Sequence, residues 1–279
     1  MPPSVTPPTV QPPAQPLPTL SLSSYENKIN AINLIGPISL KSDFPVEMGS
    51  GLLASNSYAI ADFFNEGNYS IVSHTFEYNW KEENADKLGN IVFFRKIKDR
   101  WEKSDISIEG GSQGCLHPRK AVVSDFNGDG LPDVFFACTG LDLPPFPGEK
   151  SLMLINTGSG FKKKWISFPG RNYTHSVAAA DINGDGYADL AIANMSSRDT
   201  NGECVGSGVF INDKNGNFNL DKSLIPSLDY CKTSYTTELI QVNKGEGYTL
   251  FLGGHESNKD GTMQDSRTFK WKDGKFTPE

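Results

Sequence analysis

The sequence predicts an all-β fold made of repeated four-stranded sheets, and three observations support this prediction. A pattern of strands and turns recurs about every 60 residues from residue 58 onward. The strands are short, rich in β-branched and aromatic residues, and separated by turns of Asn, Asp and Gly. No stretch has the 3.6-residue periodicity of a long amphipathic helix. Equivalent glycines mark the period, with spacings of 63, 56 and 61 residues: Gly67, Gly130, Gly186 and Gly247.

Each repeat has the same internal order. An apolar strand enters an Asp-rich loop, a second apolar strand leaves it, and a variable loop leads to two further strands joined by a short turn. Residues 121–138 followed by 151–168 form the clearest copy, and residues 176–194 followed by 208–225 form the next. Four short strands in about 60 residues match one blade of a β-propeller. We therefore predict at least four blades, at about 58–106, 119–168, 176–227 and 236–279.

The first 57 residues differ in composition from the repeats. Eight prolines fall within residues 1–20, and we expect a disordered linker or stalk there because proline fixes φ and has no amide donor. Residues 21–57 contain short apolar pieces and are compatible with a partial blade. Met1 is followed by two prolines rather than by a basic and then apolar leader. Either the protein is not exported or its leader is missing from this sequence, and the composition favours the second interpretation.

The charge and hydropathy of the chain argue against a nucleic-acid partner and against a membrane-spanning helix. The formal net charge is −7, and no basic stripe is present to neutralise the phosphates of a nucleic acid. No apolar run approaches the roughly 20 residues that a membrane-spanning helix requires. We therefore expect neither a nucleic-acid partner nor a membrane span in this chain.

Two repeats contain a nine-residue loop with oxygen-bearing side chains at positions 1, 3, 5 and 9. Calcium takes six to eight oxygen ligands, and carboxylates with one backbone carbonyl can provide them. Glycine at position 6 permits the sharp turn, and the carbonyl at position 7 is the expected backbone ligand. The predicted calcium ligands are Asp125, Asn127, Asp129, Leu131 and Asp133 in one loop, and Asp181, Asn183, Asp185, Tyr187 and Asp189 in the other.

An EF-hand loop and a metal-free hairpin are the alternatives to this kind of calcium loop. An EF-hand needs a bidentate glutamate at position 12 and flanking helices, whereas position 12 is Phe136 or Ile192 and both flanks have the pattern of strands. A tight Asn/Asp/Gly hairpin without metal is the structural alternative. Two closely similar loops, each with a further carboxylate at position 9, favour calcium over a plain hairpin.

The two loops with their flanking strands resemble FG-GAP/VCBS repeats, the units of integrin-α-type β-propellers and of many bacterial secreted proteins. The resemblance extends over about residues 58–279 and is specific at the two full loops. In the earlier loop, Phe64 occupies a ligand position and Ser70 replaces the last aspartate. In the later one, around Asn243 and Glu246, the first aspartate is missing. We expect neither of these outer loops to bind calcium well.

The resemblance also raises the question of blade number. This family usually builds seven blades, which would need about 420 residues at the observed period. The chain is therefore expected to be a fragment of a seven-bladed propeller, or a small propeller of four or five blades.

The less usual residues map to the face opposite the Asp loops. They lie just ahead of the first strands of their repeats, which places them near the central axis of a propeller. We hypothesise that His117, Arg119, Tyr173 and His175 line a ligand site there. The alternative is that these side chains satisfy backbone groups of the loops.

The four cysteines belong to the same face. None forms a C-x-x-C motif, so a zinc ribbon or thioredoxin-like site is not indicated. An even number in a loop-rich β chain favours two disulfides and an oxidising compartment, with four free thiols as the alternative. Their places in the repeats predict the pairs Cys115–Cys138 within one blade and Cys204–Cys231 between neighbouring blades.

These features predict an exported, calcium-binding propeller that acts as a binding or adhesion module for a protein or a glycan, with the metal in a structural role. It would be secreted, periplasmic or on the cell surface. A polysaccharide lyase or hydrolase on the same scaffold is the second hypothesis, and a structural spacer is the third. The segment around Ser112 matches G-x-S-x-G but lacks the strand-to-helix turn of a nucleophile elbow, and no acid/base pair stands out.

Overall fold

The structure is a computed structural model that describes residues 57–77, 86–98, 100–170, 172–195, 197–198, 201–202, 204–226, 233–241, 243, 246–254 and 265–279. The described residues form strands and turns, and no helix is present among them. None of that part of the chain therefore offers a helix that could cross a membrane. The predicted linker at 1–20 and nearly all of the segment at 21–57 lie outside the described residues.

Four antiparallel sheets follow one another along the chain, each with its four main strands in sequence order. The first contains β1 (Ser57–Ala61), β2 (Ser70–His74), β3 (Ile91–Ile97) and β4 (Arg100–Ser104). The second contains β6 (Pro118–Ser124), β7 (Asp133–Cys138), β8 (Ser151–Asn156) and β9 (Phe161–Ile166). The third contains β10 (Thr174–Ala180), β11 (Asp189–Asn194), β14 (Gly208–Asn212) and β15 (Phe218–Leu220). The fourth contains β16 (Thr236–Ile240), β17 (Thr249–Gly253), β18 (Arg267–Lys272) and β19 (Lys275–Pro278).

Three short strands add to this pattern. The strand β5 (Ile108–Glu109) pairs in parallel with β9 and extends the second sheet at its outer edge. The strands β12 (Ser197–Arg198) and β13 (Cys204–Val205) form a separate two-stranded ribbon in the loop between β11 and β14. The all-β prediction is confirmed for the described residues, and each of the four sheets is a meander.

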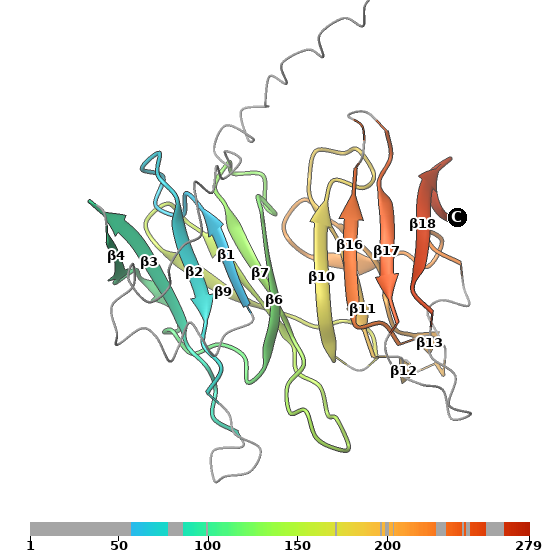
Figure 1. Cartoon of the computed structure of the whole chain (residues 1–279), viewed down its shortest axis with the longest axis horizontal. Coiled ribbons are helices and arrows are strands. Elements are labelled where there is room, and N and C mark those ends of the chain that lie inside the picture. Colours follow the sequence, from blue (N-terminus) through green and yellow to red (C-terminus); the bar gives the residue numbers. More distant parts are fainter. Residues whose placement is uncertain are drawn as a thin grey trace, which may run out of the picture.

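The first strands of the four sheets stand side by side, in the order β1, β6, β10 and β16 (Figure 1). A lysine links strands that are not neighbours in this row. The ammonium of Lys120 on β6 donates to the carbonyl of Thr237 on β16 at 3.1 Å and pairs with the carboxylate of Glu238. The side chain of Lys120 therefore reaches past β10, which stands between β6 and β16 in the row.

Apolar side chains fill each space between successive sheets. Separate clusters lie between the first and second sheets, the second and third, and the third and fourth. The strand β7 is buried on both faces: Val134 and Phe136 belong to the first cluster, whereas Phe135 and Ala137 belong to the second. Side chains alternate along a strand, so a continuous apolar run is what a strand between two packed sheets requires.

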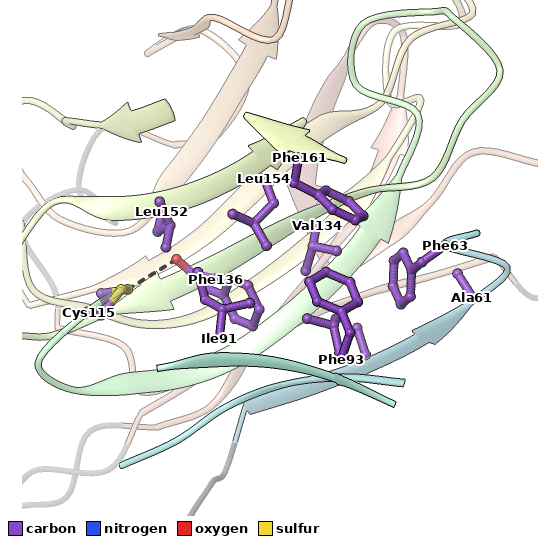
Figure 2. Packing of buried hydrophobic residues seen from close by; sticks show 13 residues of the cluster. Ala61, Phe63, Ile91, Phe93, Cys115, Val134, Phe136, Leu152, Leu154 and Phe161 are labelled. Carbon is purple, nitrogen blue, oxygen red and sulfur yellow. Dashed lines mark hydrogen bonds between the residues drawn. A yellow bond between two sulfur atoms is a disulfide. The ribbon is translucent and has the colours of Figure 1, made fainter. Parts of the chain in front are cut away.

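Figure 2 shows the first of these clusters. Ala61, Phe63, Ile91 and Phe93 come from the first sheet and its loop, and they face Val134, Phe136, Leu152, Leu154 and Phe161 of the second sheet. The rings of Phe93 and Phe161 stack with their centroids 4.7 Å apart. Burying an aromatic side chain of this size stabilises a fold by about 1.5–3 kcal/mol, so this interface is a main source of stability between the two sheets.

An asparagine at the end of the third strand ties each of two sheets to the one before it. The side-chain amide of Asn156 donates to the carbonyl of Phe63 at 3.1 Å, and that of Asn212 donates to the carbonyl of Phe126 at 2.8 Å. Both asparagines are buried. The same bond at both interfaces shows that successive sheets pack in one repeated geometry.

A disulfide joins Cys115 to Cys138, as predicted, and closes the second sheet at the end opposite its Asp loop. The buried ring of His74 lies beside it. Its Nε2 accepts from the amide of Cys115 at 2.7 Å, while Nδ1 lies 2.9 Å from the carbonyl of Thr75. The second predicted pair is outside the described residues, since Cys231 and the side chain of Cys204 are not among them.

Candidate functional site

Three equivalent loops connect the first and second strands of successive sheets, and we name them the first (62–70), second (125–133) and third (181–189) Asp loops. In each, the aspartate at position 1 organises the turn. Asp125 accepts from the amides of Asp129 at 3.1 Å and Gly130 at 2.7 Å. Asp181 accepts from the amides of Asp185 and Gly186, both at 2.9 Å. The position-6 glycines have φ of 81° and 91°, which only glycine adopts without strain.

Positions 3 and 5 of the second Asp loop bind each other at the surface. Asn127 accepts from the amide of Asp129 at 3.1 Å, and its own side-chain amide donates to the carboxylate of Asp129 at 3.0 Å. The other oxygen of that carboxylate accepts from the amide of Leu131 at 2.8 Å. Asp129 is exposed. Its carboxylate can therefore reorient toward an ion without disturbing the apolar core.

Position 9 is the most constrained place in the loop. Asp133 is fully buried, and its two oxygens accept from the amides of Phe126 at 2.9 Å and Asn156 at 2.8 Å. Burial raises the pKa of Asp133 to about 7; the two hydrogen bonds oppose this shift, and the negative charges of Asp129 and Asp125 add to it. An ionised carboxylate at this position is costly unless a positive charge lies close by.

The third Asp loop repeats this arrangement. Asp189 is fully buried and accepts from the amides of Ile182 at 3.1 Å and Asn212 at 2.9 Å. Burial raises its pKa to about 6, and the charge of Asp185 contributes in the same direction. A basic side chain lies close to position 5 of this loop, because the ammonium of Lys214 is 3.6 Å from the carboxylate of Asp185.

The donor set of these two loops fits a hard cation. Each offers three carboxylates, one amide oxygen and a carbonyl at position 7, all of them oxygen donors of the kind that calcium takes. The loop carboxylates are more widely spaced than in a closed metal cluster. Within the described residues, the titratable group with all ligand atoms inside 4.8 Å is Cys115, Cys138 and Glu149. Two of its members form the disulfide, so it is not a calcium site.

The first Asp loop has the same backbone arrangement with a different set of side chains. Asp62 accepts from the amides of Glu66 at 2.9 Å and Gly67 at 2.7 Å. At position 9, the hydroxyl of Ser70 accepts from the amide of Phe63 at 3.1 Å and donates to the carbonyl of Ala61. The fourth loop, around Asn243 and Glu246, is only partly within the described residues.

The residues predicted for the opposite face do come together. Arg119 donates to the carboxylate of Asp142 at 2.7 Å, and the hydroxyl of Tyr173 donates to the other oxygen of that carboxylate. The ring of His175 lies between those of Tyr173 and Tyr235, with centroid distances of 5.1 Å and 4.2 Å. The cluster thus joins residues of the second, third and fourth sheets or of the segments just before them.

Burial divides this cluster into two parts. Tyr173 and His117 are only 1% and 6% exposed, whereas Arg119 and His175 are half-buried. Burial, followed by the nearby charge of Arg119, lowers the pKa of His117 to about 4. Burial and the hydrogen bond to Asp142 raise the pKa of Tyr173. Tyr173 therefore keeps its proton at neutral pH and acts as a hydrogen-bond donor.

Sequence reasoning missed three residues of these sites. Asp142 lies in the loop between β7 and β8, and its acidic side chain was the available signal for an arginine partner. Arg95 and Lys214 approach the first and third Asp loops from other parts of their sheets. Only the pairing of strands brings them there, so the linear sequence gave no signal for them.

Comparisons with known proteins agree with the repeat pattern. A model of the FG-GAP-like repeat matches residues 89–192, a stretch that includes the whole of the second and third Asp loops. Integrin alpha-PS2 of Drosophila melanogaster is 28% identical over 141 residues, which cover 44% of this chain and 10% of that integrin. The chain thus spans about a tenth of the length of this relative.

Solved structures with a similar arrangement share little sequence with this chain. The V. cholerae biofilm matrix protein Bap1 is 15% identical, with a TM-score of 0.40, over 79% of this chain and 32% of that chain. An α-L-arabinofuranosidase from Lactobacillus brevis is 12% identical, with a TM-score of 0.40, over 77% of this chain and 72% of that chain. Residues 89–192, which contain both full Asp loops, therefore match the FG-GAP-like repeat, and the chain is weakly similar to an integrin α chain.

Proposed function

We propose that this chain is a β-propeller module that binds calcium in its second and third Asp loops and binds a protein or glycan partner through the opposite face. The observation that carries the proposal is the buried aspartate at position 9. Asp133 and Asp189 are fully buried near the other carboxylates of their loops, and their pKa values are raised to about 7 and about 6, mainly by burial. A divalent cation would compensate this cost and hold both carboxylates ionised.

The contacts of Asp133 and Asp189 support a structural role for the metal. Each aspartate also accepts from the backbone amide of the last residue of the third strand in its sheet, Asn156 or Asn212. These same asparagines bind the preceding sheet through their side chains. An ion in the loop would therefore stiffen a chain of hydrogen bonds that runs from one sheet to the next.

A thermal melt tests the calcium proposal directly. Calcium binding to the folded state should raise the Tm of the wild-type protein relative to the same protein in chelator. The double variant Asp129→Ala, Asp185→Ala should melt at the same temperature with and without calcium. Asp129 is exposed and Asp185 is half-buried, and neither belongs to an apolar core cluster, so the variant should still fold. A wild-type Tm that does not respond to calcium would sink the proposal.

The partner site is proposed for Arg119 and His175, the half-buried members of the opposite-face cluster. Aromatic rings beside a guanidinium and a carboxylate provide stacking surfaces and hydrogen bonds for a glycan or a protein side chain. We propose binding rather than catalysis. The carboxylate of Asp142 accepts hydrogen bonds from both Arg119 and Tyr173, so these three side chains hold one another and are not arranged as an acid/base pair.

A binding assay can test this second part separately. Arrays of glycans and of surface proteins would be screened with wild-type protein and with Arg119→Ala and His175→Ala. Loss of a hit in either variant, with an unchanged melt, supports the site. A hit that survives both substitutions places the partner elsewhere, and turnover of a glycan in the presence of calcium would favour the enzyme hypothesis instead.

An extracellular or secreted setting agrees with the disulfide and with the integrin-like repeats, because disulfides persist in oxidising compartments. We propose that within this setting the module acts in adhesion or surface recognition.

A further inference from the structure

A basic side chain lies at the position-5 carboxylate in two of the three Asp loops. In the first, a guanidinium nitrogen of Arg95 is 2.9 Å from the carboxylate of Glu66, and the group lies 3.8 Å from the ring centroid of Phe64. In the third, the ammonium of Lys214 is 3.6 Å from the carboxylate of Asp185 and 5.4 Å from the ring centroid of Tyr187. These two basic groups of the protein therefore lie at carboxylates that would otherwise attract a calcium ion.

The position-5 carboxylate of the second Asp loop differs from these two. Among the described residues, no salt bridge involves Asp129, its position-5 carboxylate. The residue equivalent to Lys214 in the second sheet is Gly158. Both follow the interface asparagine by two residues and donate to its side-chain oxygen, Gly158 at 2.9 Å and Lys214 at 3.0 Å. Gly158 has no side chain to place an ammonium over the loop.

The backbone conformation at Gly158 and Lys214 favours glycine, so a lysine there is unexpected on conformational grounds. Gly158 has a φ of 78° and Lys214 a φ of 70°. A side chain in this left-handed region is strained by about 1 kcal/mol or more, and glycine is not. The third sheet thus keeps a strained lysine where the second sheet has glycine. The position directs the side chain over Tyr187 and toward Asp185, as the two distances above show.

We propose that Lys214 sets the calcium affinity of the third Asp loop below that of the second. This inference rests on the proposed calcium binding. The ammonium neutralises part of the charge of Asp185 in the absence of metal, and an arriving ion must displace it. The second loop has no such competitor at Asp129 and fills first as calcium rises. The first loop should have the lowest calcium affinity of the three. Arg95 lies at its position-5 carboxylate, and its positions 3 and 9 are Phe64 and Ser70.

Calorimetric titration of the full chain with calcium, on variants that isolate one loop, tests this directly. Asp129→Asn leaves the third loop to be measured, and Asp185→Asn leaves the second. In the Asp129→Asn background, Lys214→Met should tighten calcium binding about two- to fivefold, the range expected for a partly exposed charge pair. In the Asp185→Asn background, Gly158→Lys should weaken binding by a similar factor.

Two controls separate the local effect from net charge. Lys103→Met removes an exposed lysine of the first sheet and should leave both affinities unchanged. The effect of Lys214→Met should shrink at high salt, since screening weakens exposed charge interactions. If both loops bind calcium but Lys214→Met changes nothing, the inference is overturned while the proposed function remains. If neither loop binds calcium in wild-type protein, the proposed function itself fails.

Discussion

The first and second Asp loops have nearly the same backbone and very different side chains. In both, the position-1 aspartate accepts from the amides at positions 5 and 6, and the position-9 side chain accepts from the amide at position 2. The first loop achieves this with Ser70 at position 9, and it places Phe64 where the second loop has Asn127. The turn therefore depends on its first residue and its glycine, and does not depend on a full set of oxygen ligands.

The comparison separates two roles of the Asp loop: residues that shape the turn, and residues that could supply metal ligands. Asp62 and Asp125 shape their loops in the same way, whereas a carboxylate at position 9 is present in the second and third loops and absent from the first, which has Ser70 there. A buried carboxylate is a costly way to satisfy an amide when a serine hydroxyl can do so. The retention of Asp133 and Asp189 at full burial is explained if the loops bind a cation.

The largest effect should follow the loss of the buried carboxylate. Asp133→Ala leaves the amides of Phe126 and Asn156 without their acceptor, which should reduce the free energy of unfolding by about 2–4 kcal/mol in chelator. Asp133→Ser, which copies the first loop, should recover part of this loss. Urea unfolding followed by circular dichroism measures both. Equal losses for alanine and serine would show that the two loops are not equivalent at this position.

Acid should affect the first sheet through a different group. The ring of His74 is buried, and burial lowers its pKa to about 4, while the hydrogen bond to Thr75 opposes the shift. The amide of Cys115 donates to Nε2, so the folded protein requires the neutral ring. An unfolded histidine titrates near 6.5. The unfolded state therefore binds more protons between about pH 6.5 and 4, and stability falls as the pH drops through that window.

His74→Gln tests this prediction in chelator. The wild-type protein should lose about 3 kcal/mol from this residue between pH 6.5 and 4, and the variant should lack that contribution. The contribution of Asp133 has the opposite sign, because its folded pKa is raised and its stability is lost as the pH rises toward 7. The difference between variant and wild type isolates His74. A difference that does not change with pH would contradict the assigned protonation state.

The sequence predicted the repeats, the loops and one disulfide because these depend on local patterns. The alternation of Asn, Asp and Gly determines the turns. The sequence could not predict the partners of those loops. Arg95 lies 29 residues beyond Glu66, and Lys214 lies 29 residues beyond Asp185, so strand pairing alone makes them neighbours. The hydroxyl of Tyr173 likewise donates to Asp142, whose loop has no strand pattern.

Two equivalent glycines differ in the space around them, because only one of them lies against the neighbouring Asp loop. Gly128 and Gly184 both stand at position 4, with φ of 78° and 77°. A Cβ on Gly128 would lie 2.5 Å from a ring carbon of Tyr187, whereas Gly184 has nothing within 4 Å. Alanine at either position should cost about 1 kcal/mol of backbone strain, and Gly128→Ala should cost about 1–3 kcal/mol more because the ring must move.

A double substitution identifies the source of that extra cost. In a Tyr187→Ala background the two alanine variants should lose similar stability, measured by urea unfolding in chelator. If Gly128→Ala remains the more harmful change there, the contact between the loops is not the cause.

The smallest effect concerns the internal cation of the first Asp loop. Arg95→Gln removes the pair with Glu66 and the contact with Phe64, both partly exposed, and should cost about 0.5–1 kcal/mol. The variant should show no calcium-dependent Tm shift beyond that of wild type, because Phe64 and Ser70 still deprive the loop of two ligands. An added calcium response in Arg95→Gln would mean that the arginine alone, and not the missing oxygen donors, keeps metal out of this loop.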